Sequence, residues 1–247
     1  MRSTHVAPNV VLLHGFTHTG ASWDPVVAAL GERYRVLAPD IRGHGSASDR
    51  VPVSLEGVID DVAASAPARF TLAGYSMGGR IALHVALALP ERIERLVLVG
   101  ASPGIADPAQ RESRREADDR LADEVEATTI EEFAGRWART PVLAGQPPEV
   151  EARVNADRLR SRPDGLARAL RGLGTGVLPS LWGRLGEIAV PAALIVGERD
   201  QKFRGIAGEM VAGLARAEIV VVPGAGHAVH LEAPDAVAGV IAEGGGA

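Results

Sequence analysis

The chain has no cysteine, and only one of its 26 basic residues, Lys202, is a lysine. The absence of cysteine excludes a disulfide framework, a thiolate metal site and a cysteine nucleophile. The remaining 25 basic residues are arginines. We attribute this bias, which accompanies abundant alanine and glycine, to genome composition. Most of the arginines are therefore expected to be solvated surface charges.

The chain also has no apolar run near the roughly 18–20 residues that a membrane-spanning helix needs. Residues 1–5 lead into a strand-like run without a hydrophobic leader core or a cleavage site, which predicts a cytoplasmic protein with no membrane partner. A formal net charge of −5 argues against a nucleic-acid partner. We expect a monomer or a weak homodimer.

With 247 residues, 46% hydrophobic and 23% charged, the chain has the composition of a globular protein with a sizeable core. Helix-length patterns at residues 23–30 and 79–89 lie between short buried runs, as expected for right-handed crossovers in a mostly parallel sheet. The fold class predicted is therefore α/β, with a doubly wound sheet. The predicted strands are residues 10–13, 35–38, 70–73, 95–99, 192–196 and 218–222.

The strand pattern is interrupted over residues 104–185. This stretch is charged and helical in period, and it contains no buried strand. We interpret it as a helical cap set over the carboxyl ends of the strands, where open α/β sheets bind their ligands. Residues 1–103 and 186–247 then form the two parts of the core. The predicted cap helices are residues 109–126, 129–139, 148–161 and 164–173.

The motif that indicates chemistry is Gly-Tyr-Ser-Met-Gly at residues 74–78. It follows a predicted strand and precedes a predicted helix, which is the context of a nucleophile elbow carrying Ser76. Glycines on both sides remove side-chain clashes from the tight turn. The start of the helix supplies free amides and a dipole that favours negative charge.

A serine hydroxyl needs a base to take its proton. His227 lies five residues past the last strand, and Asp200 follows the strand before it. The order Ser76, Asp200, His227 is the one expected for an α/β-hydrolase, with Asp200 fixing the tautomer of His227. Glu198 and His230 remain as an alternative acid and an alternative base.

The oxyanion hole is expected to consist of two backbone amides. Met77 follows the nucleophile, and Phe16 lies in the loop after the first strand. Histidines 14 and 44 are interpreted as turn-stabilising residues.

Several motifs together resemble the α/β-hydrolase superfamily. They are His-Gly-Phe at residues 14–16, Arg-Gly-His-Gly at 42–45, Gly-Tyr-Ser-Met-Gly-Gly-Arg at 74–80, Gly-Glu-Arg-Asp-Gln-Lys-Phe at 197–203 and Gly-Ala-Gly-His at 224–227. The similarity extends into the cap, where residues 102–105, 111–115, 133–142 and 159–161 resemble one branch. That branch is the 2-succinyl-6-hydroxy-2,4-cyclohexadiene-1-carboxylate synthases of menaquinone biosynthesis.

This resemblance implies a carbon–oxygen lyase that eliminates pyruvate from a small polycarboxylate. In the family, three arginines hold the substrate's three carboxylates, and they correspond to Arg80, Arg114 and Arg160. Arg80 lies one helical turn after Ser76, so it can face the same cavity. Positions that match the family as substrate-facing or nearby are Tyr75, Trp137, Lys202 and Phe203. Core packing alone would also explain the two aromatic residues Tyr75 and Trp137.

In the implied reaction the triad acts as a base on the carbon next to the succinyl ketone, and no cofactor or metal is needed. A serine hydrolase of esters or C–C bonds would use the same triad. A ligand receptor that has lost turnover is a third possibility, although a complete Ser-His-Asp set argues against it.

Overall fold

The computed structural model describes residues 7–143 and 145–243. The N-terminal segment considered above for a leader peptide and the terminal glycines lie outside the described residues. Within the described part, no helix combines the length and the apolar character needed to cross a bilayer.

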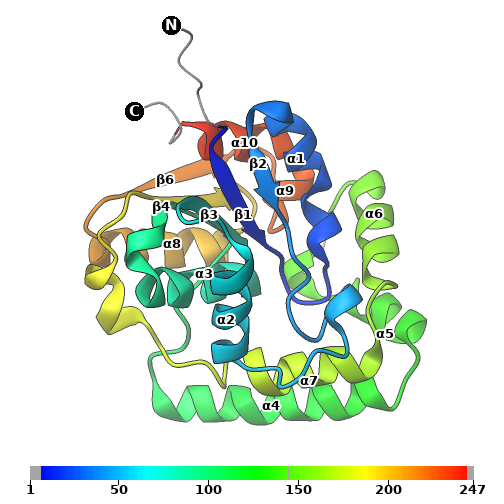
Figure 1. The fold of residues 1–247 in the computed structure, drawn as a ribbon. Helices are drawn as coiled ribbons and strands as arrows, with labels where there is room; N and C mark the ends of the chain where they lie inside the picture. The colour runs from blue at the N-terminus through cyan, green and yellow to red at the C-terminus, as the bar shows by residue number, and fades with distance from the viewer. Residues whose placement is uncertain (1–6, 144, 244–247) are drawn as a thin grey trace, which may run out of the picture.

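The core of the molecule is a six-stranded sheet in which every neighbouring pair of strands is parallel. The strand order is β2-β1-β3-β4-β5-β6 (Figure 1). The six strands predicted from apolar runs are all present, and the predicted fold class is confirmed. Their bounds are β1 Asn9–Leu13, β2 Arg35–Leu37, β3 Phe70–Tyr75, β4 Ile93–Val99, β5 Ala192–Gly197 and β6 Ala217–Val222.

Both faces of the sheet are covered, which explains why most positions of its central strands are apolar. In β1, Val11 and Leu13 belong to one core cluster, while Val10 and Leu12 belong to the other. Figure 1 shows α2, α3 and α8 on one side of the sheet, with α1, α9 and α10 on the other. These helices are α1 Asp24–Leu30, α2 Leu55–Ser65, α3 Met77–Ala88, α8 Gln201–Gly213, α9 Val229–Glu232 and α10 Pro234–Ala242.

Four further helices, the cap helices, separate β4 from β5. They are α4 Pro108–Glu126, α5 Ile130–Trp137, α6 Pro148–Arg158 and α7 Pro163–Leu173. Each lies within three residues of a predicted helix at both ends. Local signals set the starts of two of them: Asp107 caps α4, and Thr129 forms a capping box with Glu132 at α5. The division of the chain at residues 103 and 185 stays a prediction.

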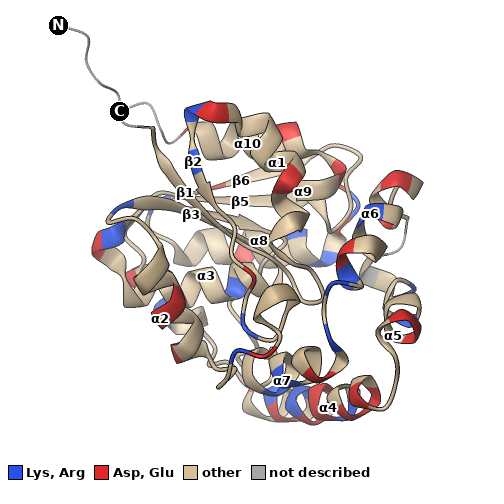
Figure 2. Cartoon of the chain, turned by 45° about the vertical axis from the view of Figure 1, so that its right-hand side comes forward, with Lys and Arg blue, Asp and Glu red and all other residues tan. Residues whose placement is uncertain are grey.

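The cap helix α4 carries charges of both signs over most of its surface (Figure 2). Its narrow buried face, which includes Ala122 and Val125, packs with Leu166 and Leu170 of α7 in a small separate cluster. This apolar contact holds the two helices together beside the carboxyl ends of the strands.

The register of the sheet brings the loops that follow β1, β3, β5 and β6 to one edge. Leu13 pairs with Gly74, Val99 pairs with both Tyr75 and Ile195, and Gly197 pairs with Val222. Residues that directly follow these strands are therefore neighbours in space.

Candidate active site

Ser76 lies at a sharp turn between β3 and α3. Its φ and ψ are 51° and −109°, a strained combination for a residue with a side chain. Close backbone packing fixes the turn, because a Cβ on Gly78 would lie 2.2 Å from the carbonyl oxygen of Leu13. A Cβ on Gly74 would lie 2.4 Å from the carbonyl oxygen of Gly78. The motif therefore forms the turn expected of a nucleophile elbow, with its glycines where strand and helix touch.

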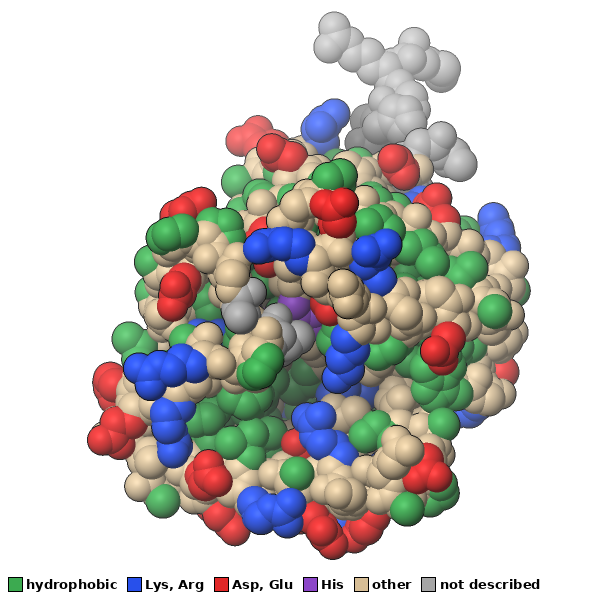
Figure 3. All heavy atoms as spheres, turned by 180° about the vertical axis from the view of Figure 1, so that it is seen from behind, with side chains coloured by type: hydrophobic (Ala, Val, Ile, Leu, Met, Phe, Trp, Pro, Cys, Tyr) green, Lys and Arg blue, Asp and Glu red, His purple; other side chains and the backbone are tan. Residues whose placement is uncertain are grey.

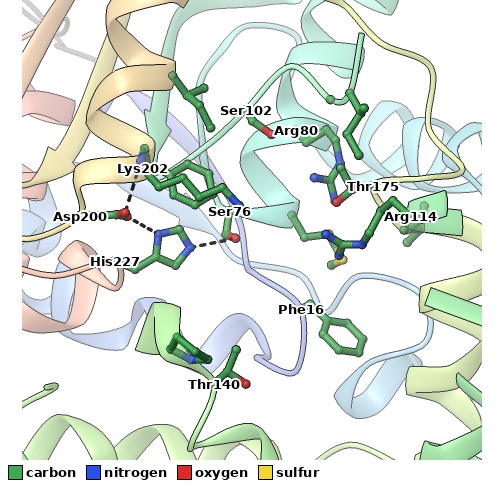
Figure 4. A pocket seen from close by; sticks show the side chains of 18 of the residues that line it. Phe16, Ser76, Arg80, Ser102, Arg114, Thr140, Thr175, Asp200, Lys202 and His227 are labelled. Atoms are coloured by element: carbon green, nitrogen blue, oxygen red, sulfur yellow. Dashed lines mark hydrogen bonds and ion pairs between the residues drawn. The ribbon is translucent and has the colours of Figure 1, made fainter. Parts of the chain in front are cut away.

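Ser76, His227 and Asp200 form one hydrogen-bonded chain (Figure 4). The Ser76 Oγ lies 3.2 Å from His227 Nε2, and His227 Nδ1 lies 2.6 Å from Asp200 Oδ2. With a proton on Nδ1, His227 donates to Asp200 and its Nε2 accepts from the Ser76 hydroxyl. Asp200 is held in turn by the Phe203 N–H, which donates to Oδ1 at 3.3 Å. This geometry allows the imidazole to take a proton from Ser76.

The backbone around His227 is confined by glycines that no other residue could replace without movement. Gly197 approaches the 225–226 turn so closely that a Cβ on it would lie 2.1 Å from the carbonyl oxygen of Gly226. Gly100 has φ +53°, and a Cβ there would lie 2.9 Å from the His227 ring. The imidazole therefore sits in a fixed place at the end of the sheet.

The two alternative residues left open by the sequence lie elsewhere. The Glu198 carboxylate is exposed and accepts from the Gly224 N–H at 2.8 Å. His230 is fully buried, with its ring centroid 4.1 Å from that of Tyr75 and 4.8 Å from that of Trp23. Burial lowers the pKa of His230 to about 3. Neither residue lines the cavity around Ser76.

The two amides expected to form an oxyanion hole belong to residues that both line the cavity with Ser76. Among the described residues, neither Phe16 N–H nor Met77 N–H donates to an acceptor. The loop that carries Phe16 is braced by His14, whose Nε2 accepts from the Ile41 N–H at 2.8 Å. Two unused amides next to a serine are suited to a developing oxyanion.

A cavity of about 820 Å³ opens over Ser76. Figure 3 shows the molecule hollowed at this point, with a histidine side chain visible at the bottom and basic side chains near the rim. Core residues of the elbow form the floor, while Trp137, Thr140 and Leu170 from the cap segment contribute to the wall. Phe16 meets Trp137 edge to face, with ring centroids 5.2 Å apart. The catalytic candidates are thus enclosed largely by apolar surface.

Arg80 and Arg114 both line this cavity and face it from the side opposite Asp200 (Figure 4). Arg80 is only 7% exposed, and its Nε has no hydrogen-bond acceptor among the described residues. Burial, with a smaller contribution from Arg114, lowers the pKa of Arg80 to about 10, so the side chain stays cationic near neutral pH. Arg114 is held by buried Asp118, which accepts from its Nε at 2.7 Å.

The prediction for Arg160 is not supported by its position. Its side chain is 64% exposed and does not line the cavity. Its Nε lies 3.8 Å from Asp157 Oδ1. The helix α6 ends at Arg158, so Arg160 falls in the turn that follows, where helical periodicity no longer sets the direction of a side chain. Two residues earlier, Arg158 is buried against the core instead, where its Nη1 donates to Asn155 Oδ1 at 2.8 Å.

Tyr75 also differs from the prediction. The ring does not line the cavity. It is buried behind the triad, 5.2 Å from the ring of His227, and burial raises the pKa of its hydroxyl. Gly15 is required beside it, because a Cβ there would lie 2.7 Å from the Tyr75 ring. Tyr75 packs against the ring of His227 on the side away from the cavity, which is the packing role left open by the sequence.

Trp137, Lys202 and Phe203 line the cavity. Their contact with a substrate stays a prediction. Phe203 packs against His227, with ring centroids 4.5 Å apart. The cavity also contains residues that the sequence did not single out, among them Ser102, Thr175, Trp182 and Arg199. Two of these had a sequence signal: Arg199 directly precedes Asp200 in a quoted motif, and Ser102 begins the quoted stretch 102–105.

Among the described residues, no group of three or more histidine and carboxylate side chains is placed to hold a metal ion.

Comparisons with known proteins agree with this architecture. The sequence profile of the alpha/beta hydrolase family matches residues 10–240. The chain is 33% identical to a 2-succinyl-6-hydroxy-2,4-cyclohexadiene-1-carboxylate synthase of Enterobacter sp. (strain 638), over 96% of this chain and 91% of that protein. It is 30% identical to a pimeloyl-[acyl-carrier protein] methyl ester esterase of Nitrosomonas europaea, over 95% of this chain and 96% of that one.

Among solved structures, MenH from S. aureus superposes with a TM-score of 0.89 at 31% sequence identity, covering 98% of this chain and 94% of that one. The profile match, the parallel sheet and the elbow at Ser76 lead to one conclusion. The chain belongs to the α/β-hydrolase family.

Proposed function

We propose that this protein is a carbon–oxygen lyase that eliminates pyruvate from 2-succinyl-5-enolpyruvyl-6-hydroxy-3-cyclohexene-1-carboxylate. The product of this reaction is 2-succinyl-6-hydroxy-2,4-cyclohexadiene-1-carboxylate. The observation that carries the proposal is the buried cation Arg80 beside the Ser76–His227 pair in one cavity.

A buried guanidinium without an anionic partner is costly, because burial removes its hydration and nothing compensates for the loss. Arg80 is in this state: its Nε has no acceptor among the described residues, and the residue lines a cavity that Arg114 also lines. A substrate carboxylate would supply the missing acceptor, and a guanidinium can grip it through two parallel hydrogen bonds. The site is therefore suited to a polycarboxylate and poorly suited to a neutral ester.

The proposed chemistry uses Ser76 as the base, with its proton passed to His227. Ser76 removes the ring proton at C2, next to the succinyl ketone, and the electron pair forms the C2–C3 double bond. The former C3–C4 double bond shifts to C4–C5, and the C5–O bond breaks. The expelled enol takes up a proton at carbon to give pyruvate. No water is consumed and no acyl-enzyme forms, so atoms balance between one substrate and two products.

In this proposal the amides of Phe16 and Met77, two residues that line the cavity, stabilise the enolate oxygen that develops when the C2 proton leaves. The apolar wall formed by Phe16 and Trp137 limits water near that charge, which strengthens each hydrogen bond to it. The family relationship and the Enterobacter relative support this assignment. A small-molecule substrate, the absence of any required cofactor, a cytoplasmic location and a monomer or weak homodimer belong to the same proposal.

Ester hydrolysis is the second candidate, favoured by the similarity to the Nitrosomonas europaea esterase. It would use the same three residues with a covalent intermediate. The third possibility, a receptor without turnover, is disfavoured by the complete hydrogen-bonded chain from Ser76 to Asp200.

The experiment that separates elimination from hydrolysis measures pyruvate from the enolpyruvyl substrate and nitrophenol from p-nitrophenyl esters in parallel. Elimination predicts stoichiometric pyruvate without a pre-steady-state burst, since no acyl-enzyme accumulates. A burst on esters together with no pyruvate would replace the lyase assignment with a hydrolase.

A further inference from the structure

The exposed position of Arg160 leaves one carboxylate of the proposed substrate without a partner. Four cationic side chains line the cavity among the described residues: Arg80, Arg114, Arg199 and Lys202. Arg80 and Arg114 lie together on one side of Ser76, and Lys202 lies on the other, next to Asp200 and His227 (Figure 4). The positive charge of the site is thus divided into two unequal groups.

The proposed substrate has the same division. Its ring carboxylate at C1 and its succinyl arm at C2 are on adjacent carbons, whereas the enolpyruvyl group is attached at C5, across the ring from C2. Two carboxylates therefore project from one end of the molecule and one from the other. When C2 is presented to Ser76 with the paired carboxylates at Arg80 and Arg114, the enolpyruvyl carboxylate extends away from both arginines.

Of the two remaining cations, Arg199 is already occupied. Its Nη1 donates to the Gly145 carbonyl at 2.9 Å, and its Nη2 donates to the buried carboxylate of Glu232 at 2.8 Å. Lys202, by contrast, has no ion-pair partner within residues 7–143 and 145–243. In Figure 4 the second dashed line at Asp200 is the bond from the Phe203 N–H.

Lys202 is held beside the reacting groups through Phe203. Its Nζ lies 5.5 Å from the centroid of the Phe203 ring, which packs against His227. Because Lys202 is exposed and Arg80 is buried, the lysine end of the cavity is the more open to solvent.

We propose that Lys202 binds the carboxylate of the enolpyruvyl group and of the pyruvate formed from it, so that the substrate lies across Ser76 between two arginines and one lysine. This inference rests on the proposed lyase function. It assigns the leaving group to one end of the cavity and makes Lys202 the residue that retains pyruvate.

The test is pyruvate binding, measured as competitive product inhibition of turnover and as saturation-transfer NMR on the protein alone. An exposed ammonium–carboxylate pair predicts that Lys202→Met raises the inhibition constant of pyruvate about two- to fivefold. Lys202→Arg should retain most of the binding, since it keeps the charge. The matched control is Arg204→Met, which removes one charge from the same helix at a residue that does not line the cavity. It should bind pyruvate as wild type does.

Two results would overturn the inference while leaving the lyase function intact. One is wild-type pyruvate affinity in Lys202→Met, and the other is weakened binding in Arg199→Met but not in Lys202→Met. If the wild-type protein released no pyruvate from the enolpyruvyl substrate, the proposed function itself would fail, which is a separate outcome.

Discussion

At the scale of single residues, Arg80 links the fold to the choice of substrate. It lies on the first turn of α3, one turn after Ser76. The turn that exposes the serine therefore also places the arginine on the same side of the helix. The family resemblance indicated Arg80, and its spacing from Ser76 allowed it to face the same cavity. Spacing did not determine the direction of the Arg160 side chain, because Arg160 follows the end of α6. It also did not determine the direction of the Tyr75 ring, which packs against His227.

The first residue-scale prediction concerns Arg80. Removing a charged partner from a desolvated site costs on the order of 2–5 kcal/mol. Arg80→Ala should therefore lower kcat/KM for the tricarboxylate by about 30-fold or more, while slow turnover of a neutral ester should fall far less. Arg80→Lys should restore only part of the loss, since an ammonium cannot form two parallel bonds to one carboxylate.

The control for this prediction is Arg160→Ala, because Arg160 is exposed and outside the cavity. It should leave kcat/KM for the tricarboxylate close to wild type. Equal losses on both substrates in Arg80→Ala would mean that the substitution damaged the elbow rather than a carboxylate contact.

At the scale of secondary-structure elements, the six strands, the four cap helices and the core helices α1 and α3 were predicted from the sequence. The helices α2, α8, α9 and α10 and the orientation of several side chains were not. Apolar runs identify β1 and β3 because both faces of the sheet are buried. The charged period of α4 identifies a helix with a narrow buried face. The sequence did not give the path of the chain after α6 and after α7, because tertiary contacts rather than local propensity set those turns. The cavity residues Thr175 and Trp182 were missed for this reason.

An element-scale prediction follows from the glycines. Gly78→Ala would press a Cβ to within 2.2 Å of the Leu13 carbonyl oxygen, so β1 and α3 would have to separate. We expect a lower melting temperature and a large loss of kcat, because Ser76 moves with the helix. The matched variant is Gly208→Ala in α8, where a Cβ meets nothing within 4 Å.

Gly208→Ala should stabilise the protein by about 0.5–1 kcal/mol through helix propensity and leave kcat unchanged. Thermal unfolding and turnover of both variants give the comparison. A Gly78→Ala protein with normal stability and activity would contradict the close packing at the elbow.

At the scale of the whole molecule, the core contains several neutral histidines. Burial is the main cause that lowers the pKa of His14 and His18, and it lowers the pKa of His44 and His230 to about 3. In the unfolded chain each of these histidines would take up a proton as the pH falls below its ordinary pKa of 6.5. Their contribution to stability is therefore complete above pH 6.5 and is lost as the pH falls from 6.5 toward 3.

Below pH 6.5 each such histidine should lower the free energy of unfolding by about 1.4 kcal/mol per pH unit. Urea unfolding at pH 7.5, 6 and 5 measures the slope. The carboxyls whose pKa is lowered, such as Asp61, have an ordinary pKa of 3.8. They therefore change the free energy of unfolding only at lower pH. His230→Phe should reduce the slope, since a phenyl ring fits between Tyr75 and Trp23 without titrating. Unfolding free energies that do not change between pH 7.5 and 5 would contradict buried neutral histidines.

In the proposed elimination Ser76 acts as the base, and His227 and Asp200 form the rest of the hydrogen-bonded triad. The most direct measurement is the rate of pyruvate release from the enolpyruvyl substrate by wild type and by Ser76→Ala, with substrate affinity measured separately. Because residues of a triad act as a unit, we expect kcat of Ser76→Ala to fall by about four orders of magnitude or more. The substrate dissociation constant should change little, since Arg80, Arg114 and Lys202 remain in place. Pyruvate release by Ser76→Ala at a rate near that of wild type would exclude Ser76 as the base.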